Sequence, residues 1–313
     1  MSFVMILAAF GGGVFGALIG GTTAFVFTGF LGLAGAATAV ASGSTLILDS
    51  VAFGPFFGPH VAFVGGVAAA AYAGRISKKR LENADFLTNP VNAKTVLGDH
   101  SDKDKIFAED DRHIDGADAT VPLFKTTDPM VLIVGGVFGI LGVLVEYLFS
   151  SIWEIPIDTV ALTVVVFAII TRYVFGTSGL TGIFPKNEKR FPFTGKMLLF
   201  NAIWGFALSG LVGYTAITLG VDNIGFSISA TSLIFLYFGL KFPVSHHVSM
   251  VAGHAAIALA SPWLAALFGL FAVITGEYVQ RLFNTHVDTH VDMPAITIAF
   301  WSFIILGVIA PFI

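Results

Sequence analysis

The sequence predicts an all-α polytopic membrane protein with about ten transmembrane helices, built as two inverted five-helix repeats that contain helices broken by Pro and Gly. Of the 313 residues, 56% are hydrophobic and only 12% are charged, and the mean hydropathy is +0.87. Soluble domains carry about twice that share of charged residues. The apolar runs are continuous and lack the alternation of a membrane β-barrel. We therefore expect helices throughout.

Apolar segments of roughly bilayer-spanning length follow one another along the chain, since about 20 residues of helix cross a membrane. The first of them is too long for one straight span and is expected to combine a tilted span with a short re-entrant piece. Glycines inside these runs predict close helix packing and would also suit a homo-oligomer. The segments are 3–35, 39–57, 59–74, 130–150, 156–175, 197–218, 225–242, 245–260, 262–282 and 293–312.

Two parts of the chain read as copies of each other. The segments 60–71 and 247–258 share seven of twelve residues. Further residues recur in the same order in the second copy. Asp128–Pro129 corresponds to Ser261–Pro262, and two acidic residues after it also have acidic counterparts. This predicts a first repeat over 1–175 that contains a polar insert at 75–129, a linker over 176–196, and a second repeat over 197–313. Five crossings per repeat is an odd number, so the copies would insert upside down relative to each other.

Basic residues predict the orientation, because Lys and Arg collect in cytoplasmic loops. Nine of the sixteen lie in 75–129 and five lie in 172–196. With five crossings per repeat these regions, together with Lys241 and Arg281, fall on one side of the membrane. We expect a multi-pass protein of the cell (inner) membrane with 75–129 and 176–196 cytoplasmic and both termini outside.

Asp49 is the clearest ionisable group inside an apolar segment. A charged side chain at the centre of a membrane helix costs about 2.5–3.5 kcal/mol on insertion scales. The equivalent position in the second copy is Leu236, and an acid in one copy alone suits a group that binds a cation or a proton. The structural alternative is a carboxylate buried near a helix end and satisfied by Thr45 or Ser50.

The repeated histidines follow helix breaks that contain Pro or Gly. Such breaks leave unpaired backbone groups and a positive helix start, and at membrane depth they are tolerated where they line a cavity; at the membrane surface they would be ordinary hairpins. His254 stands where the first copy has Val67. The group would relay protons or, less well, bind a metal; a packing role is the alternative. The predicted substrate or ion path comprises Asp49, Pro55, Pro59, His60, Pro243, Ser245, His246, His247 and His254.

Other acidic and histidine residues lie near segment ends. Glu146 corresponds to Glu277, and Asp158 to Asp292; their repetition favours capping or interhelical hydrogen bonds, with a role as gates as the alternative. A polar hairpin before the last segment contains weak metal-ligand candidates, without a standard ligand spacing. Those candidates are His286, Asp288 and His290.

These patterns favour a transporter or channel that moves a small solute or ion through a site between the repeats. The ionisable residues at that site would suit coupling to protons or cations. The organisation resembles in outline inverted-repeat carriers and the five-plus-five build of urea channels. The sequence contains no cysteine, phosphate-binding loop, zinc-protease motif or serine-nucleophile motif. We therefore expect no enzyme activity, no cofactor and no nucleic-acid partner, with the lipid bilayer as surroundings. The alternatives are a non-catalytic subunit or scaffold of a larger complex and, less favoured, a membrane-embedded enzyme.

Overall fold

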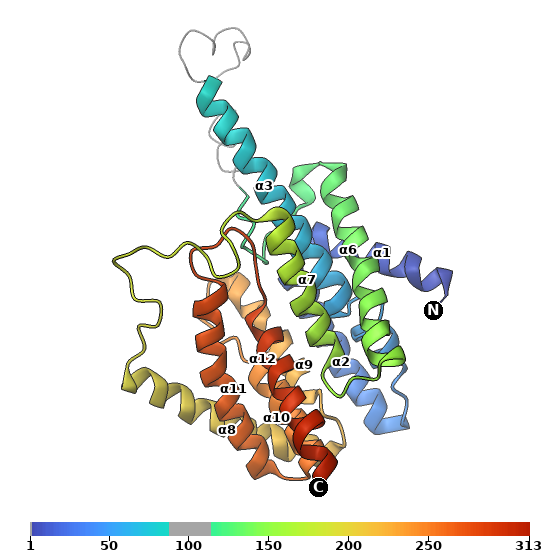
Figure 1. The fold of residues 1–313 in the computed structure, drawn as a ribbon. Coiled ribbons are helices and arrows are strands. Elements are labelled where there is room, and N and C mark those ends of the chain that lie inside the picture. The colour runs from blue at the N-terminus through green and yellow to red at the C-terminus, as the bar shows by residue number, and fades with distance from the viewer. Residues whose placement is uncertain (1, 88–113) are drawn as a thin grey trace.

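The computed structural model describes residues 2–87 and 114–313, and every regular element within these ranges is helical. The helices form one elongated bundle, with the end of α3 projecting from it (Figure 1). The first part of the chain forms α1 (Phe3–Ile19), α2 (Gly21–Ser42), α3 (Val64–Leu87), α6 (Pro129–Tyr147) and α7 (Thr159–Phe175). The second part forms α8 (Gly195–Leu219), α9 (Ile224–Ser232), α10 (His246–Leu259), α11 (Pro262–Phe283) and α12 (Met293–Ser302).

Shorter helical turns extend or connect these helices. Four are π-helical, η1 (Leu48–Ala52), η2 (Pro59–Phe63), η4 (Leu148–Ile152) and η6 (Phe303–Ile309), and three are 3-10 turns, η3 (Phe124–Thr126), η5 (Leu233–Phe238) and η7 (Ala310–Phe312). The turn η2 leads directly into α3, and η4 and η6 continue α6 and α12. Two of the π turns thus flank the break between α2 and α3, which the Pro and Gly residues at 54–59 predicted.

The start of the chain differs from the predicted segments 3–35 and 39–57. The first forty residues form two helices, α1 and α2, separated at Gly20, whose φ of +90° is open to glycine but strained for other residues. Helix α2 ends at Gly43, another residue with positive φ. The segment 44–58 then contains only η1 and turns. Likewise α3 continues to Leu87, so the insert predicted to begin at 75 begins with helix; its residues 88–113 lie outside the described part.

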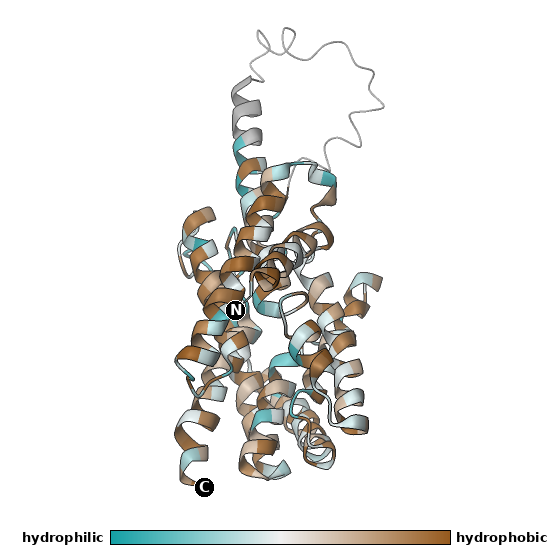
Figure 2. Cartoon of the chain, turned by 90° about the vertical axis from the view of Figure 1, so that its right-hand side faces the viewer, coloured by the Kyte–Doolittle hydropathy of each residue, from teal (hydrophilic) through white to brown (hydrophobic). Residues whose placement is uncertain are grey.

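Several helices are long and apolar enough to cross a membrane. Within the described residues there are five such segments: Gly21–Ser42, Pro129–Ile152, Gly195–Leu219, Pro262–Phe283 and Met293–Phe312. Large apolar side chains are exposed on the outside, with Trp263 76% and Phe238 71% accessible, and hydrophobic residues cover the helices on the view of Figure 2. Such a surface is unfavourable in water. The protein is all-helical with a composition and surface compatible with a membrane protein.

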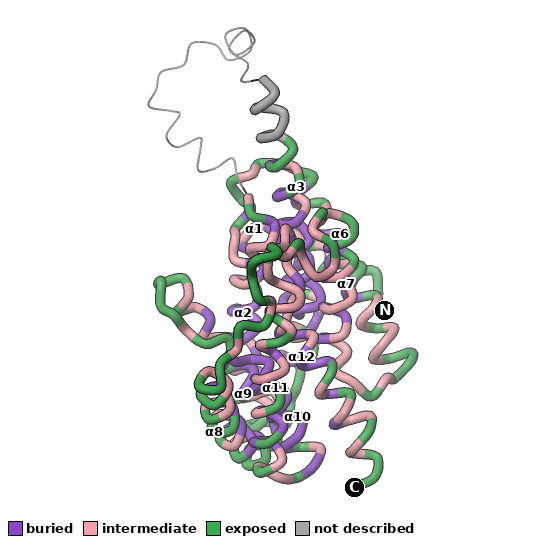
Figure 3. Tube along the Cα trace, turned by 60° about the vertical axis from the view of Figure 1, so that its left-hand side comes forward, coloured by how far each residue is buried: buried purple, intermediate pink, exposed green. Residues whose placement is uncertain are grey.

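Glycine and alanine allow the helices to approach closely in the buried interior (Figure 3). A Cβ atom on Gly13 of α1 would collide with the backbone of Gly135 in α6, and one on Gly65 of α3 would collide with Gly13. In the second part, α8, α10 and α11 contact one another in the same manner as α1, α3 and α6. Contacts of α2 with α9 and of α7 with α12 join the two parts.

Helices α7 and α12 run antiparallel. The backbone N–H of Asp158, just before α7, donates to Ser302 Oγ at the end of α12 over 2.9 Å. At the other end of α7, Thr177 donates through its hydroxyl group to Asp288, just before α12, over 2.6 Å. The beginning of each helix therefore lies beside the end of the other.

A buried arginine holds together one end of the molecule. Arg172 of α7 is 1% exposed, and its guanidinium donates to Thr289 Oγ1 and to four backbone carbonyl oxygens. All five N–H donors of the side chain are thereby used. The four carbonyl groups belong to Gly179, Leu180, Phe283 and Thr289. The loops after α7 and α11 are thus fixed around one cation.

Candidate functional site

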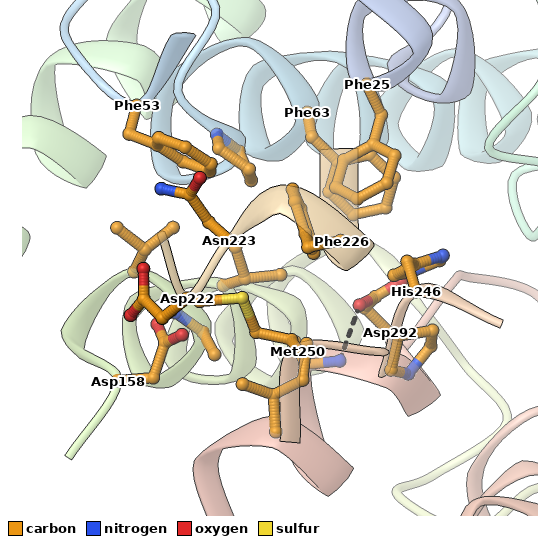
Figure 4. A pocket seen from close by; sticks show the side chains of 17 residues that line it. Phe25, Phe53, Phe63, Asp158, Asp222, Asn223, Phe226, His246, Met250 and Asp292 are labelled. Carbon is orange, nitrogen blue, oxygen red and sulfur yellow. Dashed lines mark hydrogen bonds between the residues drawn. The ribbon is translucent and has the colours of Figure 1, made fainter. Parts of the chain in front are cut away.

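A cavity of about 170 Å³ lies between the two parts of the chain (Figure 4). Residues of α2, α7, α9, α10 and α12 line it, together with the segments 53–59 and 222–223 that lie between helices. Its walls are mainly apolar, and three carboxylates and one imidazole interrupt them. The ionisable lining residues are Asp158, Asp222, Asp292 and His246.

Most of the lining consists of positions that are equivalent in the two sequence copies. Twelve lining residues form six pairs of equivalent positions. In two pairs the partners are 187 residues apart, as His60 and His247 are, and in four pairs they are 134 residues apart, as Asp158 and Asp292 are. The cavity thus contacts the same positions of both copies. The pairs are Pro59 with His246, Phe63 with Met250, Asp158 with Asp292, Val160 with Pro294, Ala161 with Ala295, and Val164 with Ile298.

The two equivalent acids cap the two antiparallel helices. Asp158 Oδ1 accepts from the backbone N–H of Ala161 over 2.8 Å, and Asp292 Oδ2 accepts from that of Ala295 over 2.8 Å. A capping carboxylate also interacts favourably with the positive end of its helix. This local geometry explains why both copies contain Asp immediately before an apolar helix.

His254 bridges two acids at one side of the cavity. Its Nε2 lies 3.1 Å from Asp158 Oδ2 and its Nδ1 lies 3.4 Å from Asp222 Oδ2. A neutral imidazole has one N–H donor, whereas the imidazolium has two. With both carboxylates ionised, only the imidazolium satisfies both contacts. We name these three side chains the Asp158–His254–Asp222 cluster.

Two members of this cluster have no counterpart in the first copy. His254 stands opposite Val67. Asp222 lies in the link between α8 and α9, whose backbone packs against Gly253; the equivalent Gly66 packs against the junction of α1 and α2 at Gly21. Asp292 is the counterpart of Asp158. Its histidine partner is His290, which is two residues away in the sequence and whose Nε2 lies 3.3 Å from Asp292 Oδ1.

Aromatic rings cover another side of the cavity (Figure 4). The ring of Phe25 from α2 lies 5.4 Å from that of Phe226 in α9 and 4.7 Å from the imidazole of His246. The centroid of Phe53 lies 5.7 Å from that of Phe226, and Phe63 lies 5.8 Å from Phe25. These separations are those of favourable ring pairs, so the four rings form one connected wall.

Two polar atoms of the lining residues lack partners. Among the described residues, Asn223 Oδ1 and His246 Nδ1 belong to the few buried side-chain atoms without a hydrogen bond. His246 is only 6% exposed. Buried polar groups are nearly always paired.

The predicted path residues are distributed differently around this cavity. Asp49 accepts from Thr45 Oγ1 over 2.6 Å, the partner named by the structural alternative, but it is exposed rather than buried. It does not line the cavity. Pro59 and His246 line it, and His254 is bound to its acids. Pro55 and Pro243 lie in the turns of the two breaks, outside the lining.

The remaining histidines of the breaks are buried packing residues. His60 in η2 is 2% exposed and His247 in α10 is 3% exposed, and Nδ1 of each has no hydrogen-bond partner. The ring of His247 lies against Gly276 and Met293. Ser245 begins α10 and its carbonyl oxygen accepts from Ser249.

The predicted gate or structural acids of the long helices form hydrogen bonds within the bundle. Glu146 accepts from Thr159 Oγ1 over 3.0 Å, and Glu277 accepts from Asn201 Nδ2 over 3.1 Å. Neither lines the cavity. Their partners join neighbouring helices, α6 to α7 and α11 to α8.

The weak metal candidates have separate partners. His286 pairs with Glu188 at 2.9 Å and His290 with Asp292. In the part of the chain that the structure describes, no three His, Asp or Glu side chains are placed to hold a metal ion. Burial acts to raise the pKa of Asp288, but hydrogen bonds from Thr177 and Ser178 outweigh this and hold that pKa at about 2.

The sequence prediction did not include Asp222, Asn223 or the aromatic wall. The sequence does contain one signal for Asp222, which is an acid in the short polar link between two apolar segments. The helix after this link, α9, is short, so the link can lie deeper in the protein than an ordinary surface loop. The phenylalanines carried no signal, because the chain contains 32 of them.

The fold and the site together define an all-helical protein with several apolar helices and a carboxylate-containing cavity between two parts of the chain. The chain belongs to a protein family described as a family of unknown function (DUF7973), which it matches over residues 1–108, 101–191 and 199–312. No curated protein and no solved structure matches it.

Proposed function

We propose that the protein is a membrane transporter or channel that moves a small solute or ion through the central cavity, between two inverted five-helix repeats. The carrying observation is the lining of this cavity by six pairs of equivalent positions. Transporters built from inverted repeats bind their substrates at the interface of the repeats, near the middle of the membrane. The antiparallel course of α7 and α12 also supports the inversion.

Coupling to protons is the second part of this proposal. Asp158 and Asp222 of the cluster line the cavity, and the imidazole of His254 between them is a group that can gain or lose a proton. Ionisable groups inside membrane segments commonly serve as proton relays. A proton that enters or leaves His254 changes the charge beside the bound solute, and this links solute movement to proton movement.

Orientation follows the predicted topology. Arg75 donates to the carbonyl oxygen of Val174, and Arg190 donates to that of Leu282. The basic segments near 75, 172–190 and 281 thus meet at one end of the molecule. We propose that this end is cytoplasmic. Because the chain has no cysteine, single cysteines at Lys186 and Leu46, labelled in intact cells, test the assignment; labelling of Lys186→Cys from outside would contradict it.

Flux through proteoliposomes tests the function. Purified protein should accelerate the entry of at least one member of a panel of small neutral and charged solutes over empty liposomes. Ala161→Phe and Ala295→Phe, which fill the cavity from both copies, should abolish that flux. Ala8→Phe on the exposed side of α1 is the matched control. Equal flux through the filled variants, in protein that elutes as folded, would exclude this cavity as the path.

A test of coupling uses His254→Gln, which keeps one hydrogen-bond donor but removes the titrating ring. In the wild type, solute flux should be accompanied by proton movement, measured with a pH-sensitive dye inside the liposomes. The variant should lose the proton movement. Proton movement that persists in the variant at the wild-type ratio to solute would show that the cluster has no part in it.

A further inference from the structure

We propose that the central cavity binds a small organic ammonium ion. This substrate class specifies the transport proposed above and rests on it. The inference stands on two features of the lining, its three carboxylates and its aromatic wall.

The charge of the lining favours a cation. Asp158, Asp222 and Asp292 line the cavity, and no Lys or Arg side chain does. His254 contacts Asp158 and Asp222, and His290 contacts Asp292. The Asp222 side chain is still 40% exposed. A bound ammonium group would interact favourably with these carboxylates.

The aromatic wall favours an organic cation over a metal ion. Phe25, Phe53, Phe63 and Phe226 present ring faces or edges to the cavity, and Met250 adds a polarisable thioether. Ring faces attract alkylammonium groups. Inorganic cations such as Ca²⁺ require about six to eight oxygen ligands, and among the described residues no three His, Asp or Glu side chains are placed to hold a metal ion. The apolar walls match the carbon atoms of an organic ion.

A polar group also lies beside the rings. Figure 4 shows the carboxamide of Asn223 close to Phe53, and both residues line the cavity. Carboxylates and rings attract ammonium groups that carry N–H donors as well as fully methylated ones.

The size of the cavity limits the ligand. A volume of about 170 Å³ equals that of about six water molecules in the liquid. An ion of a few non-hydrogen atoms fits, such as methylammonium or tetramethylammonium.

Binding to the purified full-length protein, measured by isothermal titration calorimetry in detergent, tests the inference separately from transport. The probes are methylammonium chloride and tetramethylammonium chloride, with sodium chloride as the salt control and tert-butanol as a neutral molecule of similar shape. We expect saturable binding of at least one ammonium ion and none of tert-butanol. Absence of ammonium binding, or equal binding of tert-butanol, would overturn the inference.

Three variants assign the binding to this cavity. Asp222→Asn should weaken ammonium binding about tenfold or more, because a charge partner is lost. Phe226→Leu keeps an apolar side chain but removes the ring, and should weaken binding about threefold to tenfold. Glu154→Gln, an exposed acid on the loop before α7, should bind as the wild type does. If Asp222→Asn fails to fold, Phe226→Leu alone decides; unchanged affinity there would overturn the proposed site.

The two proposals fail in different ways. Ammonium binding without flux of any solute would refute transport and leave the binding site standing. Flux of another solute that Ala161→Phe blocks, without ammonium binding, would support transport and refute the ammonium ion as its substrate.

Discussion

His254 and Asp158 are joined through Nε2 and Oδ2 at 3.1 Å, although 96 residues separate them in the sequence. The ring belongs to α10 and the acid caps α7, so the contact fastens the second part of the chain to the first. Asp222 completes it from the link before α9. Both ring nitrogens are used, and the imidazole is fixed in orientation by two carboxylates from different elements.

Replacing His254 by Val, the residue at the equivalent position 67, should destabilise the protein. Two neighbouring carboxylates would remain without their cation, and breaking a buried ion pair from one side costs about 3 kcal/mol or more. Thermal unfolding in detergent at pH 7 measures the effect. Ile257→Val, on an exposed face of the same helix, is the control. The double variant His254→Val with Asp222→Asn should regain part of the loss; no regain would show that repulsion between the acids is not its source.

Gly13→Ala should lower stability, whereas Gly11→Ala should not. A methyl group at Gly13 meets the backbone of Gly135, but at Gly11 nothing lies within 4 Å. Overpacking of this kind typically costs about 1–3 kcal/mol, while alanine in an open helical position gains up to about 1 kcal/mol from its helix propensity. Unfolding temperatures of the two variants give the comparison. Equal unfolding temperatures for the two variants would mean that α1 and α6 can move apart at no cost in the free energy of unfolding.

Arg172→Lys should be strongly destabilising despite conserving the charge. The ammonium group has three donors and no planar fork, so it leaves some of the oxygens that surround Arg172 unsatisfied. The expected cost is about 2–4 kcal/mol. Arg281→Lys, at a partly exposed position in α11, should change stability little. A Tm of Arg172→Lys within the error of the wild type would contradict the role given to the guanidinium.

Asp288 should make stability depend on pH in the acid range. Its pKa in the folded protein is about 2, below the usual 3.8. The lowered value contributes stability that is fully present above the unfolded pKa, near 4, and is lost as the pH falls toward 2. The difference in Tm between wild type and Asp288→Asn should therefore be constant above about pH 5 and shrink below about pH 4. A difference that stays constant down to the acid limit would contradict this.

The sequence predicted the helical class because charge and hydropathy are averages that no local detail alters. It also placed the breaks, since Pro55, Pro59 and Pro243 restrict the backbone directly. It divided 3–57 incorrectly, because many glycines occur there and only the structure distinguishes Gly20, with its positive φ, from those that pack inside a helix. Repeat-equivalent acids were recognisable, but the partner of Asp158 was not. A contact across 96 residues depends on how the helices are packed, which one sequence does not reveal.

Asp158 and Asp292 have different side-chain partners, and this difference has an energetic consequence for the proposed transporter. In a protein with two identical inverted halves, exchanging the conformations of the halves would give a second state that opens to the other side of the membrane. The two states would have the same free energy and would be equally populated. Here Asp158 contacts His254, which also contacts Asp222, whereas Asp292 contacts His290. These unequal contacts lift the degeneracy and favour one state at rest. Weakening the contacts of His254 would bring the populations of the two states, each open to one side of the membrane, closer to equality.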